Sequence, residues 1–488
     1  MDAAEKYEVV IGIEVHAELN TNTKMFCGCS VKFGASPNTN ICEVCLGLPG
    51  SLPAINESAV HHAVLAGLSM NCEIPKISKF DRKNYYYPDL PKAYQISQFD
   101  MPVCGKGFIE IVNSEGEKKR IGITRIHLEE DAGKLIHLTK TGQIGDAEES
   151  LVDYNRGGVP LIEIVSDPDI RSAEEARLYL DTLKSILKYI NVSDCNMEEG
   201  SLRADANVSI MPKGSETFGK RVEIKNMNSF NNVKKALEYE IQRQVKAVES
   251  GEIIKQETRL WDINKGKTFS MRSKEESHDY RYFPEPDLPF IELEDIYIEN
   301  IRKELPELPV RKMERFVKEH KIPLYDAFVL TQEAGTADFY EAVVKESGEA
   351  KLSSNWIMVE LPARMKEAGI KEISASKITP PGLGKMIGMI KKGTISGKIA
   401  KAVFDEMFVS GKDPEKIVQE KGLVQISDAG EIEKIVDAVI AANMKVVEEI
   451  KGGKDKGLGF LVGQVMKESK GKANPGMVNS ILRKKISG

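Results

Sequence analysis

The stretch Tyr-Glu-Val-Val-Ile-Gly-Ile-Glu-Val-His-Ala-Glu-Leu, residues 7–19, predicts a β-strand with two chemically different faces. Successive side chains of a strand point to opposite sides, so every second residue shares a face. One face carries Val9, Ile11, Ile13 and Val15, and the other carries Glu14, His16 and Glu18. We therefore expect one side of this strand to be buried and the other to present acids and an imidazole.

Similar polar faces recur in residues 122–131, 201–210 and 221–225, while residues 159–165 add one acid to an apolar stretch. The polar side chains contributed by these segments are Arg125, His127, Glu129, Asp131, Glu163, Arg203, Asp205, Asn207, Arg221, Glu223 and Lys225. An antiparallel sheet with one solvated face explains such alternation without any function. The expected fold class is α+β, with an N-terminal domain around an antiparallel β-sheet.

A solvated face accounts less well for a histidine and several acids on strands that also carry arginine and lysine. Carboxylate and imidazole groups can bind Mg²⁺ or Mn²⁺, and the candidates here are Glu14, His16, Glu129 and Glu163. Guanidinium and ammonium groups bind phosphate oxygens, and the candidates are Arg203, Lys225 and Lys79. Together these groups predict a phosphoryl-transfer site, where positioning and charge neutralisation provide most of the catalysis.

Four cysteines, Cys27, Cys29, Cys42 and Cys45, form a CxC–x12–CxxC pattern near the start of the chain. Two close pairs of thiolates suit a tetrahedral zinc ion, and four of them leave no open position for chemistry. The alternative is a set of unliganded thiols. Disulfides do not fit, because nothing else in the sequence indicates a secreted protein. The pattern predicts a structural zinc site.

Composition narrows the class of protein. The 488 residues are 41% hydrophobic and 29% charged, and no apolar run has the length of a membrane span. The N-terminus lacks a signal pattern, so we expect a cytoplasmic protein with no membrane partner. Residues 450–488 carry nine basic residues and two acidic ones, a local net charge of +7. This basic end indicates a polyanionic partner such as nucleic acid or, equally, a solvated helix face.

The chain changes character near residue 294, from strands and turns to helices with 3.6-residue periodicity. Residues 282–289 contain three prolines and predict a boundary, and residues 410–414 predict another. Residues 379–382, Thr-Pro-Pro-Gly, predict the start of a helix. We expect three domains: 1–293, all-helical 294–410, and a helical tail 411–488.

Two further patterns limit the chemistry. Residues 79–83 and 85–88 mix bases with aromatic residues, as a nucleotide contact would, although a half-buried loop fits equally well. Residues 388–394 resemble a phosphate-binding loop but lack the lysine that such a loop has between its last glycine, here Gly393, and the following threonine. Neither a Gly-x-Ser-x-Gly elbow nor a serine-rich amidase stretch is present in the sequence. If the reaction uses ammonia, this chain does not produce it.

Several long motifs resemble one protein family. They are Ile11–Glu18, His127–Lys134, Asn155–Ile164, Glu199–Asn207, Val222–Ser229 and His278–Asp287. These stretches are similar to those of the B subunit of the aspartyl/glutamyl-tRNA amidotransferases, and the similarity runs from about residue 7 to the C-terminus. The resemblance implies an N-terminal cradle domain around the sheet, a helical domain and a small helical tail.

The resemblance also implies an activity. The B subunit of that family uses ATP to activate the side-chain carboxylate of Glu on mischarged tRNA(Gln), or of Asp on mischarged tRNA(Asn). The amidase, or A, subunit releases ammonia from glutamine, the ammonia displaces the phosphate, and a small C subunit holds the other two together. The 488 residues leave no room for the synthetase-like insertion of the archaeal paralogue. This length favours the three-subunit enzyme, a heterotrimer.

Site residues follow from the resemblance as expectations. Magnesium ligation carries over to His16, Glu129 and Glu163, with Glu14 and Glu130 as neighbours. Catalytic roles are expected for these three ligands and for Lys79, Asp205 and Lys225, and contacts with ATP are expected for Lys79, Arg203 and Lys225. The tail, in which Asn474-Pro-Gly476 starts a last helix, resembles the family's tRNA-binding domain. The expected tRNA contacts are Lys470, Lys472, Arg483, Lys484 and Lys485, which would supply affinity more than sequence choice.

Two other functions fit part of the pattern. A metal-dependent ligase acting on a free small acid needs the same carboxylates but gives no reason for the basic tail. A non-catalytic tRNA-binding scaffold would leave the acidic strand face merely solvated. Acids and a histidine on otherwise apolar segments disfavour the scaffold.

Overall fold

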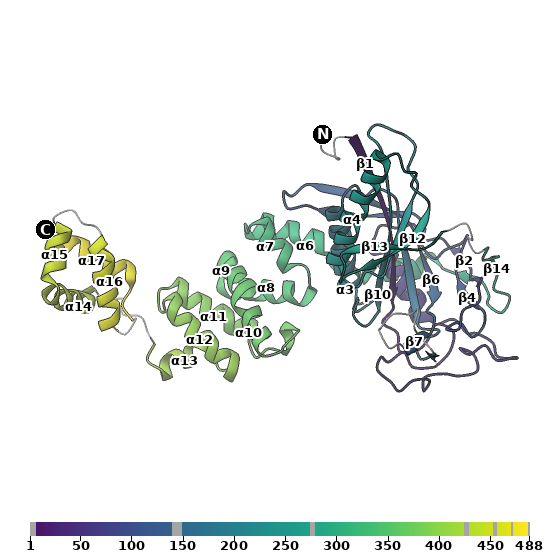
Figure 1. The fold of residues 1–488 in the computed structure, drawn as a ribbon. Coiled ribbons are helices and arrows are strands. Elements are labelled where there is room, and N and C mark those ends of the chain that lie inside the picture. Colours follow the sequence, from purple (N-terminus) through teal and green to yellow (C-terminus); the bar gives the residue numbers. More distant parts are fainter. Residues whose placement is uncertain are drawn as a thin grey trace. The chain divides into compact units, whose positions relative to one another are not determined.

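The computed structural model describes residues 6–138, 149–273, 279–423, 429–451, 456–469 and 472–486. Contacts within the chain define two compact units, Met1–Lys312 and Met313–Gly488 (Figure 1). The first contains the sheets, and the second is helical, in agreement with the predicted α+β class. The domain boundary predicted at residue 410 lies inside the second unit and stays a prediction.

In the described part of the first unit, eight strands form one sheet in the order β13-β12-β11-β10-β1-β9-β6-β5. Their bounds are β1 (Tyr7–Glu18), β5 (Gly107–Val112), β6 (Lys118–Glu130), β9 (Pro160–Ser166), β10 (Leu202–Pro212), β11 (Val222–Lys225), β12 (Glu257–Asp262) and β13 (Lys267–Ser273). The strands around β1 are antiparallel, as predicted. Strands β11 and β12 are parallel, because helix α4 (Phe230–Glu249) connects them as a crossover.

Three helices pack on this sheet: α2 (Glu57–Ser69) on β6 and β9, α3 (Ala173–Tyr189) on β5, and α4 on β10 and β13. Each begins after a residue whose side chain accepts a backbone N–H of the first turn, namely Asn56, Ser172 and Ser229. The apolar face predicted for β1 is buried at Ile11, Ile13 and Val15. Burial of this face leaves the opposite, polar face for the site.

Small sheets complete the first unit. Strands β3 (Asp81–Asn84), β4 (Tyr94–Ser97) and β14 (Phe283–Pro284) form one, β2 (Ile77–Ser78) and β15 (Ile291–Glu292) a second, and β7 (Lys134–Leu138) and β8 (Glu149–Asp153) a third. The proline-rich segment 282–289 packs within the first unit, and the domain boundary predicted at residue 293 stays a prediction. Its strand β14 pairs with β3, and Glu285 binds Arg82 at 2.7 Å.

The first unit also extends beyond residue 293. Helix α5 (Asp295–Lys303) contacts α2, and its residues Ile298 and Ile301 are buried. The chain before it is fixed as well, because Leu293 donates its N–H to the backbone oxygen of Lys76. A helical sequence pattern marked the change of secondary structure correctly but did not show which unit the first helix joins.

Helix α6 (Pro309–Arg315) is the first helix of the second unit and spans the boundary between the two units. It is followed by η3 (Phe316–His320), α7 (Leu324–Leu330), α8 (Ala334–Ser347), α9 (Ala350–Asn355), η4 (Trp356–Glu360), α10 (Leu361–Glu367), η5 (Ile373–Ala375), α11 (Pro380–Lys391), α12 (Gly397–Ser410) and α13 (Pro414–Glu420). Thr379 caps α11 by accepting the N–H of Gly382, which confirms the predicted helix start. Gly411, with φ of 70°, ends α12, as the predicted break requires.

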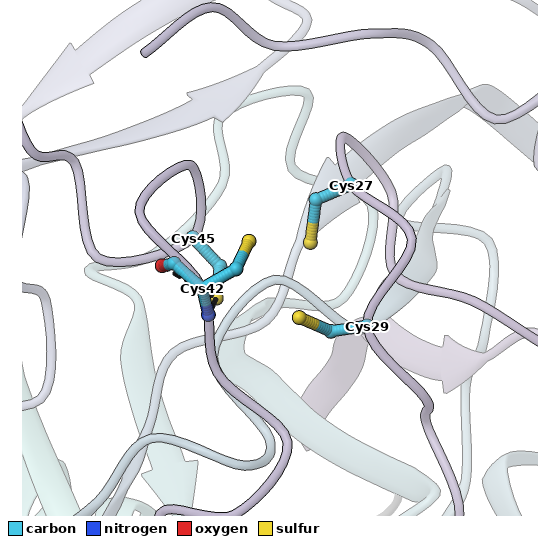
Figure 2. A group of neighbouring side chains, drawn as sticks. All are labelled: Cys27, Cys29, Cys42 and Cys45. Carbon is cyan, nitrogen blue, oxygen red and sulfur yellow. Dashed lines mark hydrogen bonds between the residues drawn. The ribbon is translucent and has the colours of Figure 1, made fainter.

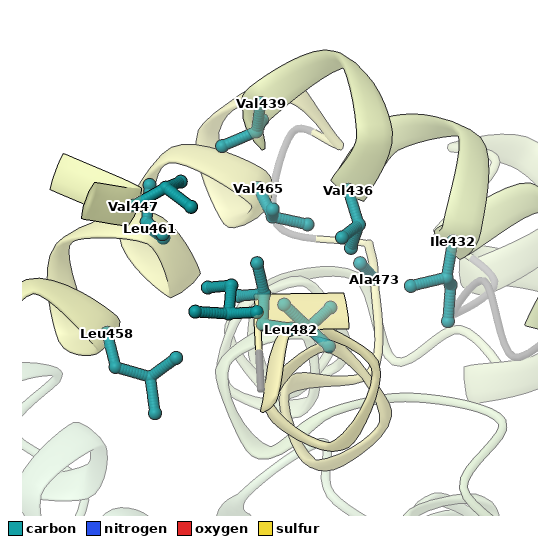
Figure 3. Close-up of a cluster of buried hydrophobic side chains, with 11 residues drawn as sticks. Ile432, Val436, Val439, Val447, Leu458, Leu461, Val465, Ala473 and Leu482 are labelled. Atoms are coloured by element: carbon teal, nitrogen blue, oxygen red, sulfur yellow. The ribbon is translucent and has the colours of Figure 1, made fainter. Parts of the chain in front are cut away.

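The tail consists of α14 (Ala429–Ala442), α15 (Met444–Lys451), α16 (Lys456–Glu468) and α17 (Pro475–Ile486). These amphipathic helices share a buried apolar core, drawn in Figure 3. Its members are Ile432, Val436, Val439, Val447, Leu458, Leu461, Val465, Ala473, Val478, Leu482 and Ile486. None of the helices in the described ranges combines the length and the apolar content that crossing a membrane requires.

Candidate active site and metal centre

The polar face of the sheet gathers side chains from four neighbouring strands into one row. His16 on β1 lies opposite Arg203 on β10 and opposite Glu163 on β9. Glu163 in turn lies opposite His127 on β6. Periodicity along each strand predicted the face, and the strand order places these four residues side by side.

Glu129 joins this row from the next position of the same face of β6. His16 Nε2 lies 3.4 Å from Glu163 Oε2 and 3.7 Å from Glu129 Oε1. His127 Nε2 lies 3.3 Å from Glu163 Oε2 and 3.6 Å from Glu129 Oε2. One ligand atom each from His16, Glu129 and Glu163 falls within 4.8 Å of the others, close enough to surround one cation. The donor set, two carboxylates and an imidazole, fits Mg²⁺ or Mn²⁺.

Electrostatics hold the two carboxylates in their charged form. Burial by itself raises the pKa of Glu163, but the charge of His127 and hydrogen bonds from His127 and His16 hold it well below its usual range. Burial likewise opposes ionisation of Glu129, and His127 and Lys83 outweigh it, so that its pKa is lowered. Both acids are therefore anionic and suited to bind a cation.

Glu14 lies one row further along β1, beside Asp205 on β10. Its carboxylate accepts a hydrogen bond from Asn207 Nδ2 at 3.0 Å. Burial and the neighbouring acids raise the pKa of Glu14. Lys225 Nζ lies 2.5 Å from Asp205 Oδ2 and 3.3 Å from Glu223 Oε1. A cavity of about 340 Å³ adjoins Glu14 and Asn207, so this end of the row is open to a ligand.

The predicted cations differ in position. Arg203 lies within the row, where its Nη2 is 2.6 Å from Asp131 Oδ2 and its buried Nε has no hydrogen-bond partner among the described residues. Lys79 lies outside the row, 2.5 Å from Asp81 and 2.6 Å from Asp100. Arg203 is thus available to an anionic group, whereas Lys79 is neutralised by two acids.

Glu130 requires a correction. It follows Glu129 on β6, and successive residues of a strand face opposite sides, so it cannot reach the same metal ion. Its carboxylate instead forms an ion pair with Lys92 and accepts the N–H of Ile96 at 2.9 Å. The motif predicted Glu130 as a neighbour of the magnesium site, but the structure places it on the other side of the sheet.

Lys83 on β3 is a site residue that the sequence reasoning missed. Its ammonium lies 5.2 Å from the ring centre of Tyr280 and 6.0 Å from that of Tyr85. Burial lowers the pKa of Lys83, but Glu129 and other neighbours raise it above its ordinary value. The mixture of bases and aromatic residues at 79–88 was the signal. Only the fold shows that Lys83, and not Lys79, faces the carboxylates.

The four predicted zinc ligands converge. Figure 2 shows Cys27 and Cys29 on one segment facing Cys42 and Cys45 on another, and their sulfur atoms lie within 4.8 Å of one another. A tetrahedral zinc ion separates its sulfur ligands by about 3.8 Å, so the cluster fits such an ion after a small contraction. The N–H of Cys42 donates to Cys45 Sγ at 3.2 Å. The cluster can bind zinc.

The basic residues of the tail are partly described. Lys470 lies outside the described residues, as does His278 of the last motif. Arg483 and Lys484 are exposed on the last turns of α17. Lys485, on the same helix, pairs with Asp437 at 2.7 Å. Lys472 lies between α16 and α17 and is half-buried.

Comparison with known proteins covers nearly the whole chain. Residues 9–299 match the family model described as the GatB/GatE catalytic domain, and residues 338–486 match that described as the GatB domain. A relative from Carboxydothermus hydrogenoformans is 59% identical over 482 residues, 99% of each chain. One from Thermoanaerobacter sp. is 57% identical over 482 residues, 99% of this chain and all of the relative. Both are named as the B subunit of aspartyl/glutamyl-tRNA(Asn/Gln) amidotransferase.

Proposed function

Because this chain belongs to the family of aspartyl/glutamyl-tRNA(Asn/Gln) amidotransferase B subunits, we propose that its polar sheet face is the ATP-dependent amidation site of that enzyme. The chain is a subunit of a carbon–nitrogen ligase that uses glutamine as the amide donor. Its substrates are Glu on tRNA(Gln) and Asp on tRNA(Asn), which become Gln and Asn. The observation that carries the location is the convergence of His16, Glu129 and Glu163.

The chemistry requires activation of a poor electrophile. A carboxylate repels nucleophiles and has no leaving group, so phosphorylation by ATP converts it into an acyl phosphate that ammonia attacks. His16, Glu129 and Glu163 would hold Mg²⁺, which when bound offsets the charge of the phosphates. Lys83 and Arg203 supply two further positive charges to the same face, and these stabilise the transferred group.

The remaining polar residues have supporting parts in this proposal. Asp205 fixes the ammonium of Lys225 at the end of the row, next to Glu14. The role of Lys225 with ATP stays a prediction of the sequence, because Asp205 and Glu223 pair with its ammonium and the lining of the adjoining cavity does not include it. The position of Lys79 between two acids offers less support for a role with ATP, so that role stays a prediction of the sequence.

The proposed partners follow from the division of the reaction between subunits. The absence of amidase motifs fits a heterotrimer in which the A subunit releases ammonia from glutamine and the small C subunit holds the other two together. The basic end of α17 is proposed to bind the tRNA backbone. Zinc in the cysteine cluster would stabilise the loop between β1 and α2 and take no part in the reaction.

The proposal is tested with the purified complex, ATP, Mg²⁺, glutamine and Glu-tRNA(Gln). ADP and Gln-tRNA(Gln) should form, and hydroxylamine in place of glutamine should trap the activated side chain as a hydroxamate. Glu129→Gln should abolish both products while the amidase subunit still hydrolyses glutamine. The matched control is Glu117→Gln, a surface substitution next to β6. Equal rates with free glutamate would favour the small-acid ligase, and no ATP consumption would favour the scaffold.

A further inference from the structure

Lys24 is a buried charge that connects the cysteine cluster to another loop of the N-terminal unit. The residue is 1% exposed. Its Nζ lies 3.6 Å from Cys45 Sγ and donates a 3.0 Å hydrogen bond to the backbone oxygen of Tyr154. A buried ammonium needs an anionic partner, because loss of its hydration is otherwise too costly. The sulfur of Cys45 supplies that partner.

The positive charge of Lys24 would offset the negative charge of a metal-bound cysteine cluster. Four thiolates around one divalent cation form a doubly negative centre, so an ammonium beside one sulfur halves the net charge buried there. Groups that surround metal ligands in this way orient them and tune the metal that they hold. Lys24 therefore belongs to the metal centre although it is not a ligand.

The loop on the other side of Lys24 fits closely against it. Gly158 has φ of +87°, and a Cβ atom there would lie 3.4 Å from Lys24 Cδ and 3.7 Å from Cys45 Cβ. The backbone oxygen of the same glycine accepts the N–H of Met25 at 2.7 Å. Lys24 therefore binds the first residue of the loop 154–158, and Met25 binds the last.

From this loop the contacts continue to the polar face of the sheet. Arg156 donates to the backbone oxygens of Ala132 at 3.0 Å and Gly133 at 2.8 Å, and its Nε lies 3.6 Å from Asp131. Asp131 also binds Arg203, the residue opposite His16. One series of hydrogen bonds and ion pairs therefore runs from the cysteine cluster to the active-site row.

We propose that Lys24 is a positioning residue through which metal in the cysteine cluster fixes the loop 154–158 and, by way of Asp131, the orientation of Arg203. The inference rests on the fit of the cluster to a metal. Only the importance of the orientation of Arg203 for the reaction rests on the proposed function. The readouts below require no turnover, so failure of the proposed function leaves this test intact.

The test uses the full complex with Co²⁺ in the cysteine cluster. A hydrogen bond from Lys24 lowers the energy of the sulfur lone pairs, so Lys24→Met should move the thiolate-to-cobalt charge-transfer band to longer wavelength. Lys24→Gln, which keeps a donor without the charge, should move it less. Lys32→Met, a lysine further along the same segment, is the matched control and should not move it. An unchanged band in Lys24→Met overturns the proposal.

A second measurement needs no variant, in case Lys24→Met does not fold. Removal of the metal from the wild-type complex by a chelator should increase amide hydrogen exchange in residues 154–158 by about tenfold or more, as for a loop that loses its anchoring contacts. Exchange in β13, at the far edge of the sheet, should stay the same. Unchanged exchange in residues 154–158 after complete removal of the metal overturns the proposal as well.

Discussion

Glu163 on β9 and His16 on β1 lie directly opposite each other in the sheet, with Oε2 and Nε2 3.4 Å apart. The two residues come from distant parts of the sequence, the first strand of the chain and a strand that begins only at Pro160. Strand order alone brings the pair together, and Glu129 completes a three-ligand arrangement on one side of it.

The first prediction concerns metal binding by this arrangement. Glu163→Gln should weaken binding of Mn²⁺ by about tenfold or more, because an amide oxygen carries no charge to offset that of the cation. Electron paramagnetic resonance of free Mn²⁺ measures the change. The control is the double variant Lys92→Met/Glu130→Gln, which removes an ion pair on the other side of the sheet and leaves no unpaired charge. Equal weakening in both variants would contradict the assignment of the ligands.

The second prediction separates two lysines of the same segment. Lys83→Met should lower the rate of hydroxamate formation by about 100-fold, as expected for loss of a charge that faces the reacting group. Lys79→Met should have a much smaller effect, since Asp81 and Asp100 already neutralise that lysine. Rapid-quench measurement with saturating ATP compares the two. If Lys79→Met is the more damaging substitution, the sequence prediction is right and the structural argument is wrong.

The site shows how far sequence alone can lead. Alternation along β1 and β6 predicted the faces of His16 and Glu129 correctly, because side-chain direction in a strand depends only on parity. The resemblance to the family motif then added Glu130 to the predicted magnesium site. Glu130 directly follows Glu129 in the strand, so its side chain faces the other side of the sheet. Lys83 was missed because its environment depends on Tyr280, in a distant part of the sequence. Contacts between residues so far apart in the sequence depend on how the chain folds, and a local sequence pattern does not contain that information.

The fold shows the same limit. Polar alternation predicted an antiparallel sheet, and the strands around β1 agree. The parallel pair β11–β12 arises because α4 is long enough to return the chain to the same end of the sheet. The prolines at residues 284, 286 and 289 predicted irregular backbone, but Pro284 lies in strand β14, which pairs with β3. Here Arg82 and Glu285 tie that segment to β3.

The third prediction is a pH dependence of stability in the metal-free protein. Burial opposes the charge of His127, but Glu163 and other neighbours raise its pKa to about 9, above the ordinary 6.5. A raised pKa contributes stability that is complete below the unfolded value of 6.5 and disappears as pH rises through about 9. The lowered pKa of Glu163 has the opposite effect on stability. Its contribution is complete above the unfolded value of 4.5 and is lost only as pH falls below that value.

Thermal unfolding measures this dependence. The Tm of the metal-free wild type should fall relative to that of His127→Gln as pH increases from about 6.5 to 9. Affinity for Mn²⁺ should rise over the same interval, because a protonated His127 beside Glu129 and Glu163 repels the cation and loses its charge as pH increases. A difference in Tm that is constant with pH would show that His127 is not charged by folding.

The last prediction concerns the basic end of the tail. Arg483 and Lys484 are exposed on α17, whereas Lys485 is paired with Asp437. The double variant Arg483→Gln/Lys484→Gln should weaken tRNA binding, and the slope of log Kd against log salt should decrease by roughly 1 to 2 because two phosphate contacts are lost. Filter binding of tRNA to the intact complex at several salt concentrations measures both quantities. Lys412→Gln, which breaks a surface pair with Glu420 elsewhere in the helical unit, is the control. An unchanged salt slope in the double variant would mean that these two cations do not contact the tRNA backbone.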